Sequence, residues 1–268
     1  MLTSSQISEF IEKGWIILPN VFSLDEMAQA RAAFERLSAT ARRLRMTQNH
    51  AGSYFVLGGS QDDDVVIQRV VWAGGCEPTL LDLSADRRLL EPSLQLLGSE
   101  QCEQLLCQAH FKMPGDGVSF DWHQDIQHRD KGPGTWRDLN GRGSYVQTLT
   151  LIDDMTDHNG PLQFIPRHAV RGDAEGRIFG AHYDYAVPMQ AGAHAPDIDV
   201  SAAVTVTGQS GSVLFFGPYA VHGSTANTSS QPRRVLINGY AYPGANGRVY
   251  PGEGSGRILS RSSWSTQA

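Results

Sequence analysis

The chain has 268 residues, of which 40% are hydrophobic and 19% are charged. This composition supplies enough apolar material for a sizeable core and too little charge for a disordered chain. The net charge of −6 provides no positive field for a phosphate backbone, so nucleic acid is not an expected partner. No apolar run reaches the roughly 18 residues that a membrane span needs. The first ten residues also lack the basic stretch of a leader, so we expect a cytoplasmic protein without a membrane partner.

The domain organisation is expected to be simple. Over residues 1–268 we expect one domain, with a helical scaffold over about 1–100, a β core over about 101–243 and a tail over 244–268. The three cysteines lack the CxxC spacing of a zinc or redox site, so free thiols in a reducing cytoplasm are expected. The abundance of glycine and proline after Pro114 is typical of many short strands joined by turns.

The first hundred residues predict helices and a few strands. A short helix capped by Thr3 or Ser4 ends before Gly14, and residues 15–19 are expected to form a strand. The sequence Ser-Leu-Asp-Glu at 23–26 is a capping box that begins a longer helix. Its apolar residues recur at helical spacing, namely Met27, Phe34, Leu37 and Ala41. Further strands are expected at 53–57, 66–73 and 105–113, with a helical stretch at 79–98.

From residue 117 onwards the pattern favours an all-β core. Short β-branched or aromatic runs alternate with turn clusters, at 119–126, 145–153, 162–166, 202–207, 212–218 and 234–242. This spacing predicts a barrel or jelly roll. The segments 127–143 and 172–200 exceed the usual length of a connector and are expected to be binding loops or lids.

Three residues suggest a metal site. His123 and Asp125 are two residues apart in an apolar run, and on a strand both side chains would face one side. His222 follows a hydrophobic strand that ends in a turn, where it would stand at the mouth of the barrel. Two histidines and one carboxylate form the facial triad that holds Fe(II) and leaves coordination positions open.

An arginine that follows the second histidine is a candidate for binding a carboxylate. Arg233 lies 11 residues after His222 and precedes a predicted strand, so its guanidinium can point into the barrel. A planar, permanently charged fork holds a carboxylate through two parallel hydrogen bonds. Because Arg234 comes next, we expect one residue of this pair to face solvent.

Three segments together resemble one family. FDWHQD at 120–125, HNGPLQFIPRH at 158–168 and HGSTANTSSQPRR at 222–234 are similar to the phytanoyl-CoA dioxygenase family of non-haem Fe(II), 2-oxoglutarate-dependent oxygenases, which includes the ectoine hydroxylases. The resemblance covers about residues 5–243. It implies a double-stranded β-helix (the jelly roll of cupin-like proteins) with flanking helices.

The resemblance also implies roles for individual residues. It implies that His123, Asp125 and His222 bind iron. Arg233 would hold the distal carboxylate of 2-oxoglutarate with help from Ser224, while Phe120 would line the co-substrate. The turn at 159–162 is interpreted as structural. Asp125 is a carboxylate where halogenating relatives carry a small residue, so halogenation is not expected.

The implied reaction consumes O2 and converts 2-oxoglutarate to succinate and CO2. It hydroxylates an unactivated C–H bond of a small molecule; desaturation, cyclisation and epimerisation are alternatives. Trp122 alternates away from the metal and is expected in the core. The candidates for substrate contacts lie in the loops and on inward strand faces: Gln127, His128, Trp136, Arg137, Tyr145, Gln147, Arg171 and Tyr183.

Two other classes fit the same barrel. A cupin-like metal-dependent isomerase or lyase would need the triad but no carboxylate clamp. In a non-catalytic jelly-roll binding module the triad would be incidental. The placement of Arg233 favours the oxygenase. The sequence leaves the oligomeric state open.

Overall fold

The strands of the protein form two antiparallel sheets. The computed structural model describes residues 1–58, 65–172 and 198–264, so Tyr183 and most of the long segment 172–200 lie outside the described residues. The larger sheet contains β1 (Trp15–Leu18), β2 (Gln48–His50), β3 (Ser53–Gly58), β4 (Val66–Val71), β5 (Gln101–Lys112), β7 (Tyr145–Leu151), β10 (Val213–Phe216), β12 (Arg233–Ala241) and β13 (Arg257–Ser260). The smaller sheet contains β6 (Phe120–His123), β8 (Leu162–Ile165), β9 (Val204–Val206) and β11 (Val221–Ser224).

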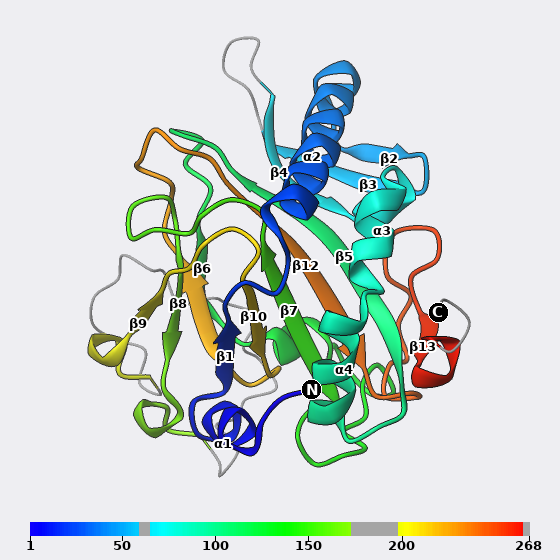
Figure 1. The fold of residues 1–268 in the computed structure, drawn as a ribbon, viewed down its shortest axis with the longest axis vertical. Helices are drawn as coiled ribbons and strands as arrows, with labels where there is room; N and C mark the ends of the chain where they lie inside the picture. The colour runs from blue at the N-terminus through cyan, green and yellow to red at the C-terminus, as the bar shows by residue number, and fades with distance from the viewer. Residues whose placement is uncertain (59–64, 173–197, 265–268) are drawn as a thin grey trace.

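The strand order is that of a double-stranded β-helix. In the larger sheet it runs β1-β10-β7-β12-β5-β4-β3-β2, with β13 also paired to β5, and in the smaller sheet β6-β11-β8-β9. Strands that are consecutive in the chain thus alternate between the sheets from β5 to β8 (Figure 1). The all-β jelly-roll core predicted from the sequence is confirmed.

Helices cover the outer face of the larger sheet. They are α1 (Ser4–Lys13), α2 (Leu24–Leu44), α3 (Pro78–Ser84) and α4 (Arg87–Leu97), and Figure 1 shows α2, α3 and α4 beside β4, β5 and β12. Thr3, one of the two caps expected for the first helix, caps α1, and Ser23 caps α2 through the capping box that its sequence predicts. Thr3 also forms a capping box, with Gln6. The helical stretch expected at 79–98 is two helices, because the side chain of Asp86 caps a new helix after α3 has ended. Short 3₁₀ turns are η1 (Ala73–Gly75), η2 (Asp125–His128), η3 (Arg167–Ala169), η4 (Val200–Ala202) and η5 (Arg261–Trp264).

Alternation along the central strands divides the core into two parts. On β12, Leu236 and Tyr240 face the helices and pack in the cluster that includes Phe34. Ile237 faces the other way and shares the barrel interior with Phe164 of the smaller sheet. This is the two-residue period of a strand buried on both faces. The interior between the sheets is where the predicted site residues lie.

Three features depart from the sequence expectations. The first hundred residues also supply β1 to β4 to the larger sheet, so the expected boundary near residue 100 does not divide it. The tail contributes β13, which pairs with β5. His222 lies within a strand, β11, where the sequence predicted only a turn after β10.

Two other expectations agree with the structure. Trp122 is buried, and the three cysteines are free thiols. Within the described ranges, no helix has both the length and the hydrophobicity of a bilayer span.

Candidate active site

The two candidate histidines lie on neighbouring strands. β6 and β11 pair antiparallel, and the register places His123 directly opposite His222. The centres of the two imidazole rings are 4.2 Å apart. β6 ends at His123 and Asp125 opens the 3₁₀ turn η2, so the expectation that both belong to one strand face is wrong. The turn nevertheless brings the carboxylate back to the rings.

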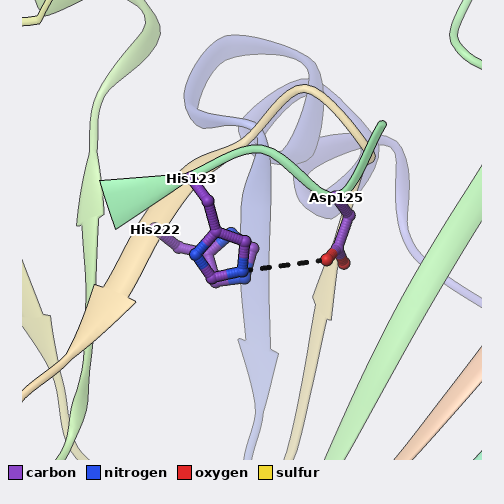
Figure 2. Close-up of side chains that lie close together, drawn as sticks. All are labelled: His123, Asp125 and His222. Atoms are coloured by element: carbon purple, nitrogen blue, oxygen red, sulfur yellow. Dashed lines mark ion pairs between the residues drawn. The ribbon is translucent and has the colours of Figure 1, made fainter. Parts of the chain in front are cut away.

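The three side chains converge on one point. One ligand atom from each of His123, Asp125 and His222 lies within 4.8 Å of the other two. The His123 Nε2 and the Asp125 Oδ1 are 3.9 Å apart. Figure 2 shows the two rings side by side with the carboxylate directed at them. These separations suit three ligands of one metal ion, each about 2 Å from its centre.

Backbone carbonyls orient both rings. The Nδ1–H of His123 donates to the carbonyl oxygen of Asp121 over 2.6 Å, and that of His222 donates to Ala220 over 2.9 Å. This leaves the Nε2 lone pair of each ring for a metal. Burial lowers the pKa of His222 to about 4, so this ring is neutral near neutral pH.

Asp125 is the clearest sign that a cation belongs here. It is 5% exposed, and its Oδ2 is buried without a hydrogen-bond partner among the described residues. Burial opposes its ionisation, but electrostatic interactions with the neighbouring His222 and Arg129 side chains outweigh burial and hold the pKa of Asp125 below the usual range. A buried carboxylate oxygen without a partner is costly unless a cation takes it up. Two imidazoles with one carboxylate are the donor set that suits Fe(II).

A second group of side chains forms a cationic cradle beside the triad. Arg233 is 3% exposed and pairs across the strands with Lys112. The Lys112 Nζ donates to the Ser224 hydroxyl over 2.7 Å and also to the Thr225 carbonyl. Phe120 completes the cradle, since Lys112 Nζ lies 5.6 Å from the centre of its ring. Two adjacent buried basic side chains suit a dianionic ligand, which favours their charged forms.

The turn at 159–162 contributes to this cradle. The Gly160 carbonyl accepts hydrogen bonds from Nε and a terminal nitrogen of Arg233, the first over 3.1 Å. A Cβ at position 160 would lie 2.7 Å from Lys112 Cδ and 2.8 Å from the Thr225 carbonyl. Glycine is therefore needed here for space as well as for its φ of 80°. The turn is structural, as expected, and it also fixes the guanidinium.

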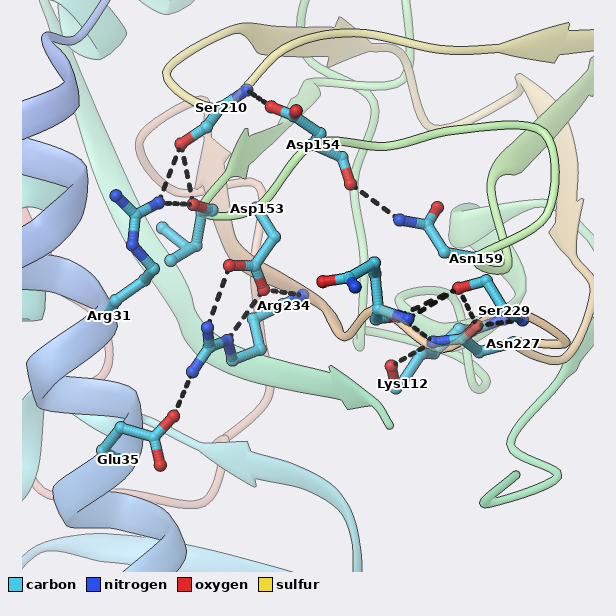
Figure 3. A network of polar contacts seen from close by, with 12 residues as sticks. Arg31, Glu35, Lys112, Asp153, Asp154, Asn159, Ser210, Asn227, Ser229 and Arg234 are labelled. Atoms are coloured by element: carbon cyan, nitrogen blue, oxygen red, sulfur yellow. Dashed lines mark hydrogen bonds and ion pairs between the residues drawn. The ribbon is translucent and has the colours of Figure 1, made fainter. Parts of the chain in front are cut away.

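Arg234 does not face solvent. It is 7% exposed, and its guanidinium bonds to the Asp153 carboxylate over 2.7 and 2.9 Å. A further terminal nitrogen pairs with Glu35 of α2 (Figure 3). The expectation that one of the two arginines is solvent-facing is wrong because α2 covers this face of β12.

The triad and the cradle open into one cavity of about 550 Å³. Its lining includes the triad, Phe120, Ser224 and Arg233, and of the substrate candidates it includes His128 and Gln147. Tyr145 is buried just behind, with its hydroxyl donating to Gln147 Oε1 over 2.7 Å.

The remaining substrate candidates are held elsewhere. The Gln127 side chain caps η2, and the Trp136 indole donates to the Gly143 carbonyl. Arg137 donates to the Gly244 carbonyl, and Arg171 is exposed. None of these four lines the cavity.

Sequence reasoning missed several residues of the site. Lys112 of the cradle is a charged residue at the end of a buried, largely apolar strand, and this contrast could have marked it as a candidate. Arg129, Arg248 and Tyr250 come from the loop after η2 and from the C-terminal segment, and each lines the cavity. No local pattern distinguishes them from surface loop residues.

A facial triad and a buried arginine inside a jelly roll define a 2-oxoglutarate-dependent non-haem iron dioxygenase. The chain belongs to the phytanoyl-CoA dioxygenase family, whose model matches residues 10–235. This membership makes Fe(II), 2-oxoglutarate and O2 its cofactor and co-substrates, and it sets aside the cupin-like isomerase and the binding module.

Individual relatives agree with this assignment. The chain is 30% identical to an L-proline trans-4-hydroxylase of Streptomyces griseoviridis, over 85% of this chain and 82% of the relative. A crystal structure of EctD from S. alaskensis with 2-oxoglutarate and 5-hydroxyectoine matches with a TM-score of 0.66 and 24% identity, covering 97% of this chain and 84% of that one. The carbocyclase SnoK from nogalamycin biosynthesis matches with a TM-score of 0.65 and 18% identity, covering 97% of each chain. Both structures establish the shared fold.

Proposed function

We propose that this dioxygenase hydroxylates a C–H bond of a small molecule, with Fe(II) held by His123, Asp125 and His222. The observation that carries the proposal is the convergence of one ligand atom from each of these three residues within 4.8 Å, together with the buried Asp125 Oδ2, which has no hydrogen-bond partner among the described residues. Three ligands on one side leave positions for 2-oxoglutarate, and later for oxygen. When bound, the iron supplies the oxidising chemistry, with decarboxylation of 2-oxoglutarate to succinate.

We propose that the cationic cradle binds 2-oxoglutarate. Arg233 would hold the distal carboxylate, because its guanidinium is buried, lines the cavity and is fixed by the Gly160 carbonyl. The Ser224 hydroxyl and the Lys112 ammonium group are already joined to each other within reach of the same carboxylate. Phe120 supplies an apolar wall. Together these groups orient the co-substrate with its keto acid end towards the triad.

The other walls of the cavity would hold the substrate and exclude water. Leu149, Phe216 and Ile237 supply an apolar surface next to the triad, and Gln147 supplies an amide on the same side. Water exclusion protects the reactive centre from side reactions. Proline and ectoine are small molecules, and a cavity of this size suits a substrate of that scale. The three free cysteines fit a reducing compartment, so we place the enzyme in the cytoplasm.

Hydroxylation is the outcome we propose. The relative that is 30% identical is named as a hydroxylase. The carbocyclase is 18% identical and shares the fold alone. We therefore propose hydroxylation rather than desaturation, cyclisation or epimerisation.

The test is anaerobic addition of Fe(II) and 2-oxoglutarate to metal-free protein. A weak visible charge-transfer band, seen only when both are present, is expected in the wild type. His222→Ala should abolish the band, and Arg233→Ala should need much more 2-oxoglutarate to develop it. A wild type that binds iron without developing any band would contradict the proposal.

A further inference from the structure

A second buried arginine lines the same cavity as the triad and the cradle. Arg129 follows η2 and is 4% exposed. Its guanidinium lies against two phenol rings, 4.6 Å from the centre of Tyr145 and 5.3 Å from that of Tyr250. It donates to the Tyr145 hydroxyl over 2.8 Å and to the Tyr250 hydroxyl over 3.5 Å. Its Nε is buried with no partner among the described residues.

No carboxylate is dedicated to this cation. In the described ranges Arg129 forms no ion pair, and Asp125 is the carboxylate whose charge acts on it. Asp125, however, is a proposed metal ligand, so the bound metal ion takes up its charge. A guanidinium buried without a counter-ion is costly, and such a residue is retained where a ligand supplies the charge.

The strand register places the two arginines towards opposite ends of β12. Arg233 begins this strand, and Arg129 contacts Tyr145 near its other end. Along β7 and β12, Tyr145 pairs with Ala241, eight residues beyond Arg233. Eight residues of extended strand span roughly 26 Å. An anion at Arg129 would therefore be held well apart from the distal carboxylate of 2-oxoglutarate, within the same cavity.

The residues around Arg129 make room for its two tyrosine partners and connect them to the cavity. Gly239 faces Tyr145, and a Cβ there would lie 2.0 Å from the Tyr145 hydroxyl, so glycine makes the room that this phenol needs. The Tyr145 hydroxyl donates to Gln147, whose side chain lines the cavity. Arg248 lies over the ring of Tyr250, 5.1 Å from its centre, and adds a second positive charge to the same wall.

The described part of the cavity lining is positive in an acidic protein. Among the described residues the cationic side chains of Arg69, Arg129, Lys131, Arg233 and Arg248 line it, together with the carboxylates of Asp121 and Asp125. A dianionic co-substrate and a divalent metal offset one another in charge. The excess of positive charge that is left favours an anionic substrate.

We propose that Arg129, supported by Tyr145 and Tyr250, receives the carboxylate of the substrate, which makes the substrate a small carboxylic acid. The inference rests on the proposed dioxygenase function and names its substrate class. The two phenols occupy only part of the five N–H donors, and the free Nε–H with a neighbouring N–H forms the planar edge that matches two carboxylate oxygens. The substrate would be anchored at its acid group, and a C–H bond farther along it would face the metal.

The test uses pairs of probes in which one member carries a carboxylate and the other carries an amide or no acid group. Benzoate and benzamide, hexanoate and hexanamide, and L-proline and pyrrolidine are titrated calorimetrically into anaerobic protein saturated with Fe(II) and 2-oxoglutarate. We expect at least one acid to bind and its neutral or acid-free twin to bind at least about 30-fold more weakly. Equal binding within every pair, or no binding by any of the acids, would overturn the substrate class.

Variants then locate the binding group. Arg129→Gln should weaken the acid by at least about 30-fold, and Arg129→Lys by less, because lysine keeps the charge without the fork. Arg142→Gln, an exposed arginine outside the cavity, is the matched control and should bind like the wild type. Unchanged binding in Arg129→Gln would overturn the role of Arg129.

Two readouts separate this inference from its alternatives. If Arg129 only held the loop together, Arg129→Gln would lower the melting temperature of the metal-free protein. We expect an unchanged or higher melting temperature, because a buried charge without a counter-ion is removed. The Fe(II)–2-oxoglutarate band should be the same in Arg129→Gln and the wild type. Absence of the band from the wild type would defeat the dioxygenase proposal, whereas its presence without acid binding would defeat only the substrate class.

Discussion

The ammonium group of Lys112 donates to the hydroxyl of Ser224 over 2.7 Å and so joins β5 to the strand that carries His222. Lys112 also stands opposite Arg233 in the β5–β12 register. Two basic side chains are thus buried side by side, next to the strand that carries a proposed metal ligand. Their charged forms repel each other, and a bound dianionic co-substrate would relieve this repulsion, so its binding is coupled to protonation of Lys112.

Binding of 2-oxoglutarate should therefore take up a proton at Lys112. Burial, and then the charge of Arg233, lower the pKa of Lys112 to about 6, so at about pH 8 this amine is largely neutral in the free protein. A bound carboxylate favours the charged form and raises the pKa again. Calorimetry in buffers of different ionisation enthalpy should show uptake of nearly one proton, and affinity should fall as pH rises above about 6. In Lys112→Met the uptake should vanish.

The stability of the metal-free protein gives an independent check on Lys112. Because the folded-state pKa lies below that of the unfolded chain, the unfolded chain binds more protons between about pH 6 and about pH 10. The contribution of Lys112 to the free energy of unfolding therefore rises with pH across that window. Lys112→Met should flatten this rise, whereas Lys13→Met, at an exposed lysine, should not. Identical pH profiles in all three proteins would contradict the lowered pKa.

Gly160→Ala should weaken 2-oxoglutarate binding while metal binding persists. The new Cβ would lie 2.7 Å from Lys112 Cδ, so either the turn or the lysine must move, and the Gly160 carbonyl would no longer hold Arg233 in place. Misplacing a charged hydrogen-bond donor costs about 1.5 kcal/mol or more, which corresponds to at least about a tenfold rise in KM for 2-oxoglutarate. Gly98→Ala is the control, because it imposes similar backbone strain at φ 67° with nothing within 4 Å. Equal effects of both variants on KM would contradict this account.

Local signals in the sequence were enough for much of the fold. The capping boxes at Thr3 and Ser23 involve residues three apart, so their chemistry is visible in a short window. Strand alternation and turn residues likewise predict the β core. His123, Asp125, His222 and Arg233 were found because the spacing of their residue types is itself the pattern of a known family.

Contacts between distant residues explain what the sequence did not show. Lys112 meets Ser224 across 112 residues of sequence, and Arg234 meets Glu35 across 199. Whether a charged residue is buried or exposed depends on which element covers it, and α2 covers Arg234. The role proposed for Arg129 likewise depends on its contacts with Tyr145 and Tyr250, which come from β7 and from the C-terminal segment.

Metal should stabilise the folded protein through the triad. The buried Asp125 Oδ2 lacks a partner among the described residues, and a divalent ion that binds the native state alone stabilises it by an amount that grows with the logarithm of the ion concentration relative to its Kd. Anaerobic Fe(II) at about a hundred times its Kd should add about 2.7 kcal/mol, read as a higher melting temperature. His222→Ala should abolish this shift. His158→Ala, at an exposed histidine, should keep it, and a shift that survived in His222→Ala would place the metal elsewhere.

Arg234 should be important for stability and unimportant for the chemistry. Its guanidinium holds the largely buried Asp153 carboxylate over 2.7 and 2.9 Å and links β12 to Glu35 on α2 (Figure 3). Arg234→Met would leave Asp153 without its partner, and losing one member of a buried pair costs about 3 kcal/mol or more. Glu35 is 63% exposed, so Glu35→Gln should cost at most about 1 kcal/mol. Urea unfolding of both variants measures the difference, and equal losses would mean that the stability comes from the contact with α2 rather than from the buried pair.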